Sequence, residues 1–592
     1  MRRQLKLAIV VAVLIVLGLF AIRHGAWVAG LIALAAGLAL VAAFLAFAFF
    51  PARIPRDSVL MIRLSGRMRE HSLRSPLDQL MGRGFPSLHQ LRRAIEAARI
   101  DASVSVAIVE ISGLEIGLAT ACEIHDLLSS LRTAGKRVVA ILAGDNATVR
   151  EYLAASGAGE VIANPDLGMM MLGVAASSFF LKGALAKMRI QAQTLQYKEY
   201  KGAAEMFNRD AMSPALRESL EAIVADWQVT LAGKVAAARK IEPDRARRLL
   251  GEGFISAETA REAGLIDRAG YVEDLEAELD PEGRAKRFVS LARYLRRVAY
   301  SRRPAKARIA LIHALGPVVA GEPPFAGEYL SGPVVAAEIN RVARDRRVRA
   351  IVLRVNSPGG SAVGSDLVWR ATLEARRRGK PLVVSMGDVA GSGGYYVAMA
   401  ADAIVAEPAT VTGSIGVVYS KLNLGGLLAE LGIRVDYAKS DAISDALSAS
   451  RALTEAELAQ LDKMVGELYA TFTKKVADGR KLSPERTEEV ARGRVWTGRA
   501  ARESGLVDEL GGLERAIQIA REKAGLRSNQ PHELVTFPES TLLSGLRLAL
   551  MPAQMPLGMT LASKAMEIPS DWAPAMLALL AETRALLLCP LF

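Results

Sequence analysis

The chain has 592 residues, which is enough for two or more domains with sizeable cores, and its formal net charge at pH 7 is +13. The excess is local, because residues 283–308 carry ten basic and no acidic side chains, and the first fifty residues carry four basic and no acidic ones. A basic nucleic-acid-binding face is therefore not expected, and two cysteines, Cys122 and Cys589, give neither a disulfide framework nor a metal-ligand spacing.

The N-terminal residues predict a membrane anchor. Apolar runs at 7–22 and 26–50 are separated by Arg23-His24-Gly25. The second run is long enough to span a bilayer, the first is marginal, and no small-residue cleavage site follows it. One span would place the body of the chain outside the cytosol and a two-span hairpin would return it; the flanking charges fit either. We expect residues 1–52 to be an anchor with one or two spans.

A long internal repeat predicts the domain organisation. Residues 260–267 (AREAGLID) recur at 501–508 (ARESGLVD), and matching segments keep a nearly constant spacing along the two halves. This period is far too long for a solenoid and indicates a duplicated domain. We expect an N-terminal repeat at 53–282, a basic linker at 283–306, a C-terminal repeat at 307–527 and an apolar, Pro- and Met-rich tail at 528–592, which we interpret as a subunit-docking or interfacial segment.

Each repeat alternates β-rich apolar runs with helical runs. The second repeat predicts strands and helices in turn at 350–355, 366–377, 382–385, 395–401 and 403–406. A longer helix at 455–478 has a counterpart at 213–240. Such alternation predicts an α/β fold with mostly parallel strands, present twice.

Ser392 lies in a small-residue turn, GDVAGSGGYY, between a predicted strand and helix. A serine there is exposed beside the free N–H groups of the helix, which suits a nucleophile with an oxyanion donor. Taken alone, the stretch is better explained as a tight turn. The repeat adds information, because Ser392 aligns with Val149 and the turn at 356–360 aligns with 112–116. The hydroxyl and the Gly-Gly step therefore belong to the second half only.

A serine nucleophile needs a proton acceptor, and histidine is poorly placed to provide it. Only His532 follows Ser392, in the divergent tail, and the pattern G-x-S-x-G fails because residue 390 is alanine. A lysine can act instead if burial lowers its pKa. Lys201 lies in the first half, its counterpart near 442–444 is not lysine, and Lys198 is its rival. Independent drift of the two halves would also produce this distribution.

Three motifs together, NSPGGS at 356–361, AGSGGY at 390–395 and TGSIG at 412–416, resemble the signal peptide peptidase A family in its double-length, membrane-anchored bacterial form. The resemblance covers about 59–525. It implies tandem Clp-protease/crotonase-like domains of repeated β-β-α units, and a serine–lysine dyad divided between the halves. It assigns Ser392 as nucleophile, Lys201 as base and Ser414 as a hydrogen-bond partner of the lysine, with the oxyanion turns at Gly359, Gly360 and Gly393.

The resemblance also implies a membrane-anchored serine endopeptidase that degrades remnant signal peptides and other short apolar peptides through an acyl-enzyme. No cofactor, metal or nucleic acid is expected. The expected assembly is a homotetramer. The implied location is the inner membrane, with the catalytic body on the extracytoplasmic side. Two alternatives are an acyl-CoA hydratase or isomerase of the same fold, which would use carboxylates, and a non-catalytic membrane scaffold.

Overall fold

The computed structural model describes residues 54–71, 86–283, 287–300, 307–321, 329–527 and 532–537, with residue 530 and a few positions between 23 and 39. The expected anchor at 1–52 lies almost entirely outside these residues, as does the tail beyond Phe537. Among the helices that are described, none is long and apolar enough to cross a membrane.

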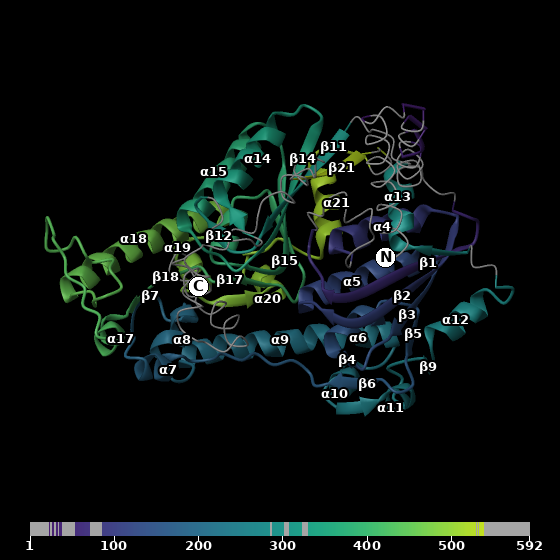
Figure 1. Ribbon diagram of the computed structural model, residues 1–592, viewed down its shortest axis with the longest axis horizontal. Helices are drawn as coiled ribbons and strands as arrows, with labels where there is room; N and C mark the ends of the chain where they lie inside the picture. The colour runs from purple at the N-terminus through teal and green to yellow at the C-terminus, as the bar shows by residue number, and fades with distance from the viewer. Residues whose placement is uncertain are drawn as a thin grey trace.

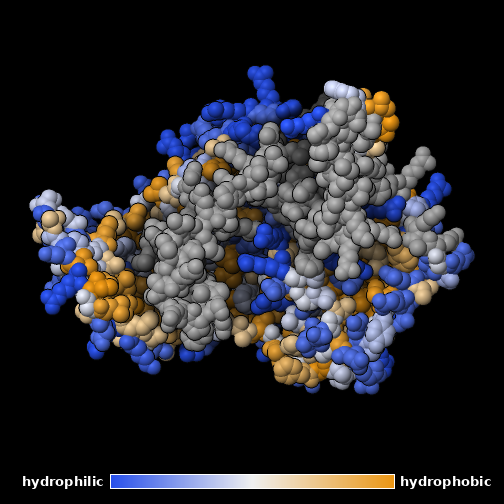
Figure 2. Space-filling model, viewed as in Figure 1, coloured by the Kyte–Doolittle hydropathy of each residue, from blue (hydrophilic) through white to orange (hydrophobic). Residues whose placement is uncertain are grey.

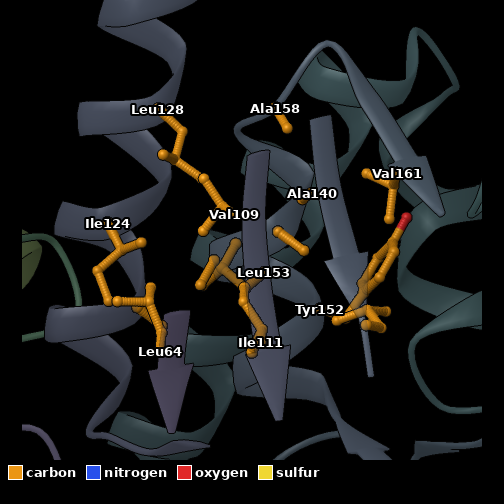
Figure 3. Packing of buried hydrophobic residues seen from close by; sticks show 14 of the residues in the cluster. Leu64, Val109, Ile111, Ile124, Leu128, Ala140, Tyr152, Leu153, Ala158 and Val161 are labelled. Carbon is orange, nitrogen blue, oxygen red and sulfur yellow. The ribbon is translucent and has the colours of Figure 1, made fainter. Parts of the chain in front are cut away.

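The first half is built on a six-stranded parallel sheet. Its order is β10 (Phe288–Ser290), β1 (Ser58–Arg67), β2 (Val104–Glu115), β3 (Arg137–Leu142), β5 (Glu160–Ala163) and β9 (Arg268–Ala269). One face carries α4 (Leu88–Ile100), α5 (Leu118–Thr133) and α6 (Val149–Ser156), which pack on it through an apolar core (Figure 3). The other face packs against Leu275 of α12 (Val272–Leu279). Burial on both faces explains why these strands are apolar almost throughout.

The second half repeats this architecture, as the alternation of predicted elements indicated. Its main parallel path is β21 (His532–Phe537), β11 (Ala307–Leu315), β14 (Val348–Ser357), β15 (Leu382–Gly391), β16 (Ala403–Ala406) and β20 (Glu509–Leu510). One face is covered by α14 (Gly332–Arg344), α15 (Ala362–Arg377) and α16 (Gly393–Ala398), and the other by α21 (Leu513–Lys523). The α/β class and the duplication are confirmed.

A short pair of strands in each half shows which residues of the two halves correspond at the turn before α6 and before α16. In the first half β4 (Asn146–Thr148) pairs with β6 (Gly168–Met171), beginning with Asn146 opposite Gly168. In the second half the end of β15 pairs with β17 (Val411–Gly413), beginning with Val389 opposite Val411. The number of residues from Asn146 to Val389 equals the number from Gly168 to Val411. We call this offset the displacement between the halves; it also relates Val149 to Ser392, so these two residues occupy equivalent positions.

Residues expected to form the linker and part of the tail instead belong to the sheets. Within 283–306, β10 pairs with β1 and α13 (Leu291–Tyr300) packs behind it, with Val289 and Tyr294 buried. Within 528–592, β21 pairs with β11. Each half thus ends with a strand that returns to the edge of its own sheet. The basic composition of this segment favours a linker, and the three-residue strand β10 has too few apolar residues to be recognised within it.

A segment of the first half packs against the second half (Figure 1). After β6 the chain forms α7 (Lys182–Lys187) and β7 (Gln191–Tyr197), and β7 pairs antiparallel with β18 (Val417–Asn423) of the second half. The long helix α9 (Pro214–Arg239) then runs back along the first half, as α18 (Glu455–Arg480) does in the second. This excursion places Lys201, which follows β7, against the second half.

Candidate active site

Ser392 lies at the sharp turn between β15 and α16 in an unusual backbone conformation. Its φ is 52° and its ψ is −116°, a region that costs free energy for a residue with a side chain. Its N–H donates to the carbonyl oxygen of Gly413 at 2.8 Å, and only 2% of the residue is exposed. The ladder between β15 and β17 therefore holds the serine in this conformation.

The glycines of the Pro-Gly-Gly turn allow the chain to approach Ser392 closely. Gly359 has a φ of +113°, and a Cβ placed on it would lie 2.7 Å from the Cβ of Ser392 and 2.9 Å from the nitrogen of Gly393. The Gly359 N–H donates to Ser357 Oγ at 3.2 Å. By contrast, the N–H groups of Gly360 and Gly393 have no acceptor among the described residues. These two N–H groups are the free donors beside the serine, whereas Gly359 contributes its conformation.

Lys201 reaches the serine from the other half of the chain. Its Nζ lies 2.9 Å from Ser392 Oγ, 2.8 Å from the carbonyl oxygen of Ser414 and 2.9 Å from Ser414 Oγ. The residue is 2% exposed, and burial lowers the pKa of its amine from 10.5 to about 7. A large fraction of the amine is therefore neutral near pH 7, with a lone pair available to accept a proton.

Two glycines that the sequence analysis did not assign form the walls around this lysine. A Cβ on Gly416 would lie 3.1 Å from Lys201 Cδ, and one on Gly493 would lie 2.5 Å from Lys201 Cβ. Gly416 belongs to the TGSIG motif, so a signal for it was present. Gly493 follows Arg492 in a turn far along the chain, and no sequence motif marks it.

The rival lysine is held elsewhere. Lys198 Nζ forms an ion pair with Glu488 at 3.1 Å, and its side chain is 38% exposed. It also lies over the rings of Tyr197 and Tyr469, 5.6 and 5.7 Å from their centroids. Lys198 therefore lacks both the burial of Lys201 and its contact with Ser392.

The histidines that the structure describes lie away from the serine. His532 is on β21, which β11 and β14 separate from β15. His71, His89 and His313 instead cluster where the halves meet, with ring centroids 4.7–6.0 Å apart; His71 and His313 are stacked, and His89 meets both edge-on. Within the described part of the chain, no group of histidine, cysteine or acidic side chains is placed to hold a metal ion.

Buried polar contacts fix one half against the other around the site. Arg354 is fully buried and pairs with Glu70 at 2.9 Å and Glu123 at 2.7 Å, both from the first half. Asp388, four residues before the serine, accepts hydrogen bonds from the N–H and Oγ1 of Thr120 at 2.9 and 2.6 Å. Its carboxylate thus satisfies an N-terminal donor of α5 and aligns β15 with the first half.

A cavity of about 1170 Å³ opens between the halves beside the turn that contains Ser392. Pro358 and Val389 of the second half line it, together with Val149 and Met170 of the first. Neither Ser392 nor Lys201 lines the cavity, so it lies beside these two residues and does not contain them.

Comparison of the chain with known proteins identifies its family. The model of peptidase family S49 matches the chain twice, at residues 130–286 and 374–527. The chain belongs to peptidase family S49. It is 30% identical to the chloroplastic serine protease SPPA of Arabidopsis thaliana over 501 residues, which are 83% of this chain and 72% of that protein. It is 32% identical to Protease 4 of Salmonella typhi over 454 residues, 74% and 72% of the two chains.

A shorter relative matches only part of the chain. The putative signal peptide peptidase SppA of Enterococcus faecium is 33% identical over 202 residues, covering 34% of this chain and 59% of the relative. The S49 assignment makes the chain a serine peptidase by family and favours this function over an acyl-CoA hydratase or isomerase of the same fold. The resemblance to the signal peptide peptidase A family is confirmed with it.

Proposed function

We propose that this S49 peptidase uses Ser392 as its nucleophile and Lys201 as its general base. The observation that carries the proposal is the 2.9 Å separation of Lys201 Nζ and Ser392 Oγ, which joins side chains 191 residues apart in a buried site. The lowered pKa of the lysine and the positive φ of the serine support the same roles, because each costs stability that a purely structural site would avoid.

In the proposed reaction, the neutral amine of Lys201 takes the proton of Ser392 Oγ as the oxygen attacks a peptide carbonyl carbon. The N–H groups of Gly360 and Gly393 donate to the oxyanion that forms. The carbonyl and hydroxyl oxygens of Ser414 accept hydrogen bonds from the new ammonium. Lys201 then gives its proton to the leaving amine as the C–N bond breaks, and water hydrolyses the acyl-enzyme with Lys201 acting again as base.

We propose short, apolar, membrane-derived peptides, including remnant signal peptides, as substrates. The name of the Enterococcus faecium relative supports this class, and so does the cavity beside the turn, whose walls include Leu114, Ile116, Val149, Met170 and Val389. We further propose an N-terminal anchor in the inner membrane with the catalytic body on the extracytoplasmic side, a homotetrameric assembly, and a Clp-protease/crotonase-like fold for each half. The apolar runs at 7–22 and 26–50 support the anchor.

The dyad is tested by covalent labelling with a fluorophosphonate probe, followed by peptide mapping. Labelling is expected at Ser392 and is expected to disappear in Ser392→Ala. The control variant Ser420→Ala, which removes a hydroxyl from β18, keeps the label. Labelling of a different serine, or undiminished hydrolysis of an apolar test peptide by Ser392→Ala, would overturn the assignment.

A further inference from the structure

Strands β7 and β18 pair with one another and so join the two halves of the chain. Because the halves are duplicates, each of these strands has an equivalent segment in the opposite half. Their register runs from Val417 opposite Tyr197 to Asn423 opposite Gln191. The displacement that carries Val149 onto Ser392 makes residues 434–440 the counterpart of β7 and residues 174–180 the counterpart of β18. Local geometry tests whether that displacement holds here.

The helices beside these segments correspond in detail. α7 begins at Lys182 and α17 (Gly425–Glu430) at Gly425, as the same displacement requires. The N–H of Leu181 donates to the carbonyl of Met206, and that of Leu424 to the carbonyl of Ala449, so donor and acceptor are both displaced equally. Positive φ recurs in the same way, at 57° and 71°, in the turns that follow the helices, at residues 189 and 432.

The counterpart segments are both left without a strand partner. No backbone hydrogen bond joins 174–180 or 434–440 to another strand within the described residues. Exposed and half-buried positions alternate along 174–180 as on a strand, with Phe179 69% exposed, and Val435 in the other segment is 48% exposed. Figure 2 shows apolar surface at the end of the molecule where Figure 1 places α17. Open strand edges with apolar side chains attract further strands.

We propose that residues 434–440 of one copy pair antiparallel with residues 174–180 of a second copy, in the register that β7 and β18 use within the chain. Val174 then lies opposite Ser440, and Phe180 opposite Arg434. The two exposed apolar side chains, Phe179 and Val435, fall directly opposite one another, which removes both from water. This inference deepens the proposed homo-oligomer and is independent of the catalytic roles.

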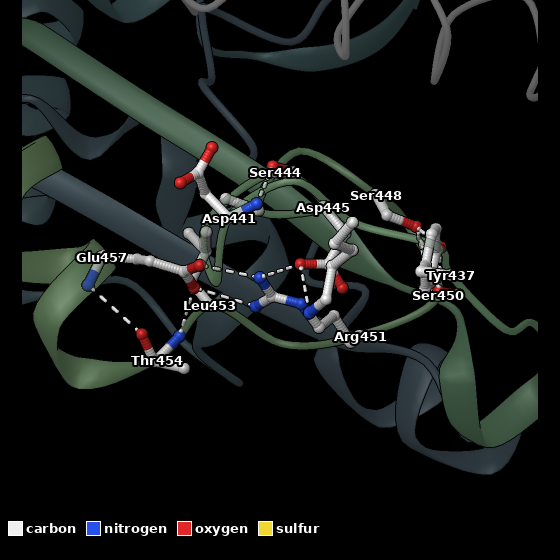
Figure 4. Close-up of polar contacts among 12 residues, drawn as sticks. Tyr437, Asp441, Ser444, Asp445, Ser448, Ser450, Arg451, Leu453, Thr454 and Glu457 are labelled. Carbon is white, nitrogen blue, oxygen red and sulfur yellow. Dashed lines mark hydrogen bonds and ion pairs between the residues drawn. The ribbon is translucent and has the colours of Figure 1, made fainter.

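The contact joins two different surfaces, so it is head-to-tail. The second half of one copy would contact the first half of the next copy in the way that the first half contacts the second within one chain. Repeating this contact closes a ring or produces a filament. A ring leaves no such edge open. The segment is presented on an ordered base (Figure 4), where Arg451 binds Asp445 and Glu457 at 2.8 and 2.7 Å and Tyr437 hydroxyl contacts Ser450 at 2.6 Å.

Cysteine cross-linking of the full chain in detergent tests the register. Phe179→Cys and Val435→Cys are made in separate, differently tagged chains that also carry Cys589→Ser, then co-expressed and oxidised. A disulfide-linked dimer carrying both tags is expected, with none from either variant alone. Lys439→Cys is the matched control, because it should cross-link to Ala175→Cys but not to Phe179→Cys, which is four residues out of register and about 13 Å away along the strand.

Each other outcome rejects a defined part of the inference. A dimer from Phe179→Cys alone would mean a symmetric contact, and an internal disulfide in the double variant would mean that the segments pair within one chain. The molar mass from light scattering tests the proposed oligomer separately from the strand pairing. A monomeric chain overturns both, whereas an oligomer that cross-links at neither matched pair overturns only the strand pairing. Fluorophosphonate labelling of Ser392 reports separately on the dyad.

Discussion

The same strand-to-helix turn occurs in both halves, but the side chains buried at it differ. In the second half Ser392 holds a positive φ, and the N–H groups of Gly360 and Gly393 are free within the described structure. In the first half Val149 takes the place of the serine, and the buried carboxylate of Glu151 accepts hydrogen bonds from the N–H groups of Leu114 and Thr148, both at 2.8 Å. A buried carboxylate therefore ties the first-half turn to neighbouring backbone, whereas the second-half turn has a buried hydroxyl beside two free N–H groups.

The halves also differ in what they give to one another. The first half sends β7 and Lys201 into the second, whereas the corresponding loop of the second half, near residue 444, carries no lysine and lies largely exposed. The duplicated scaffold thus keeps its architecture while its side chains diverge. In the proposed mechanism, one half supplies the amine and the other supplies the hydroxyl and the oxyanion donors.

The strongest test of that division compares two lysines three residues apart. Lys201→Ala removes the proposed base, and kcat for an apolar peptide is expected to fall about 10²–10⁴-fold. Lys198→Ala removes only an exposed ion pair with Glu488 and should leave kcat within about twofold. Circular dichroism checks that both variants fold. Equal losses, or a larger loss in Lys198→Ala, would contradict the assignment of the base.

A second test compares glycines in the corresponding turns. Gly359→Ala places a Cβ 2.7 Å from Ser392 Cβ and must displace the turn at the proposed nucleophile, so kcat is expected to fall about 10²–10³-fold with little change in KM. Gly113→Ala, in the first half, has a φ of +57° but no atom within 4 Å of the new Cβ. It should cost about 1–2 kcal/mol of stability and no activity. Comparable kinetic losses in both would show that the effect is general destabilisation.

The pH profile tests the neutral lysine. Because a protonated amine cannot act as base, kcat/KM is expected to fall tenfold per pH unit below about 7 and to level off above it. Ser414→Ala removes an acceptor of the ammonium, so this limb should move to lower pH. Folding lowers the pKa of Lys201 from 10.5, the unfolded chain binds more protons between about 7 and 10.5, and its contribution to stability therefore rises with pH there. A limb near pH 10 would refute the buried neutral amine.

The smallest effect on activity is expected at the first-half turn before α6, where Glu151 accepts two backbone hydrogen bonds. Glu151→Ala leaves the N–H groups of Leu114 and Thr148 without their acceptor and should lower the free energy of unfolding by about 1–3 kcal/mol, measured by urea denaturation. Glu151→Gln keeps an acceptor and should recover part of the loss. Hydrolysis by either variant should match the parent chain, since this turn performs no chemistry. A loss of kcat with unchanged stability would show that the first half still contributes to the reaction.

Several parts of this structure were predictable from the sequence because they depend on short-range patterns. Strand β14 and helix α15 follow from runs of apolar residues and helix formers, and the duplication follows from matching segments at a nearly constant spacing. The placement of Ser392 opposite Val149 followed from the same alignment. The edge strands β10 and β21 did not, because a short strand among arginines or beyond a Gly-containing turn is stabilised by its pairing with β1 or β11, not by its own composition.

By itself the sequence determined two α/β halves, a serine at a strand-to-helix turn, and two lysines from which a base had to be chosen. Only the tertiary structure distinguishes them, since groups distant in the chain bury Lys201 and lower the pKa of its amine. Gly416 and Gly493 enclose Lys201, whereas Lys198 is 38% exposed and paired with Glu488. The same holds for the free N–H groups, because whether a donor is satisfied depends on which acceptor the fold brings to it.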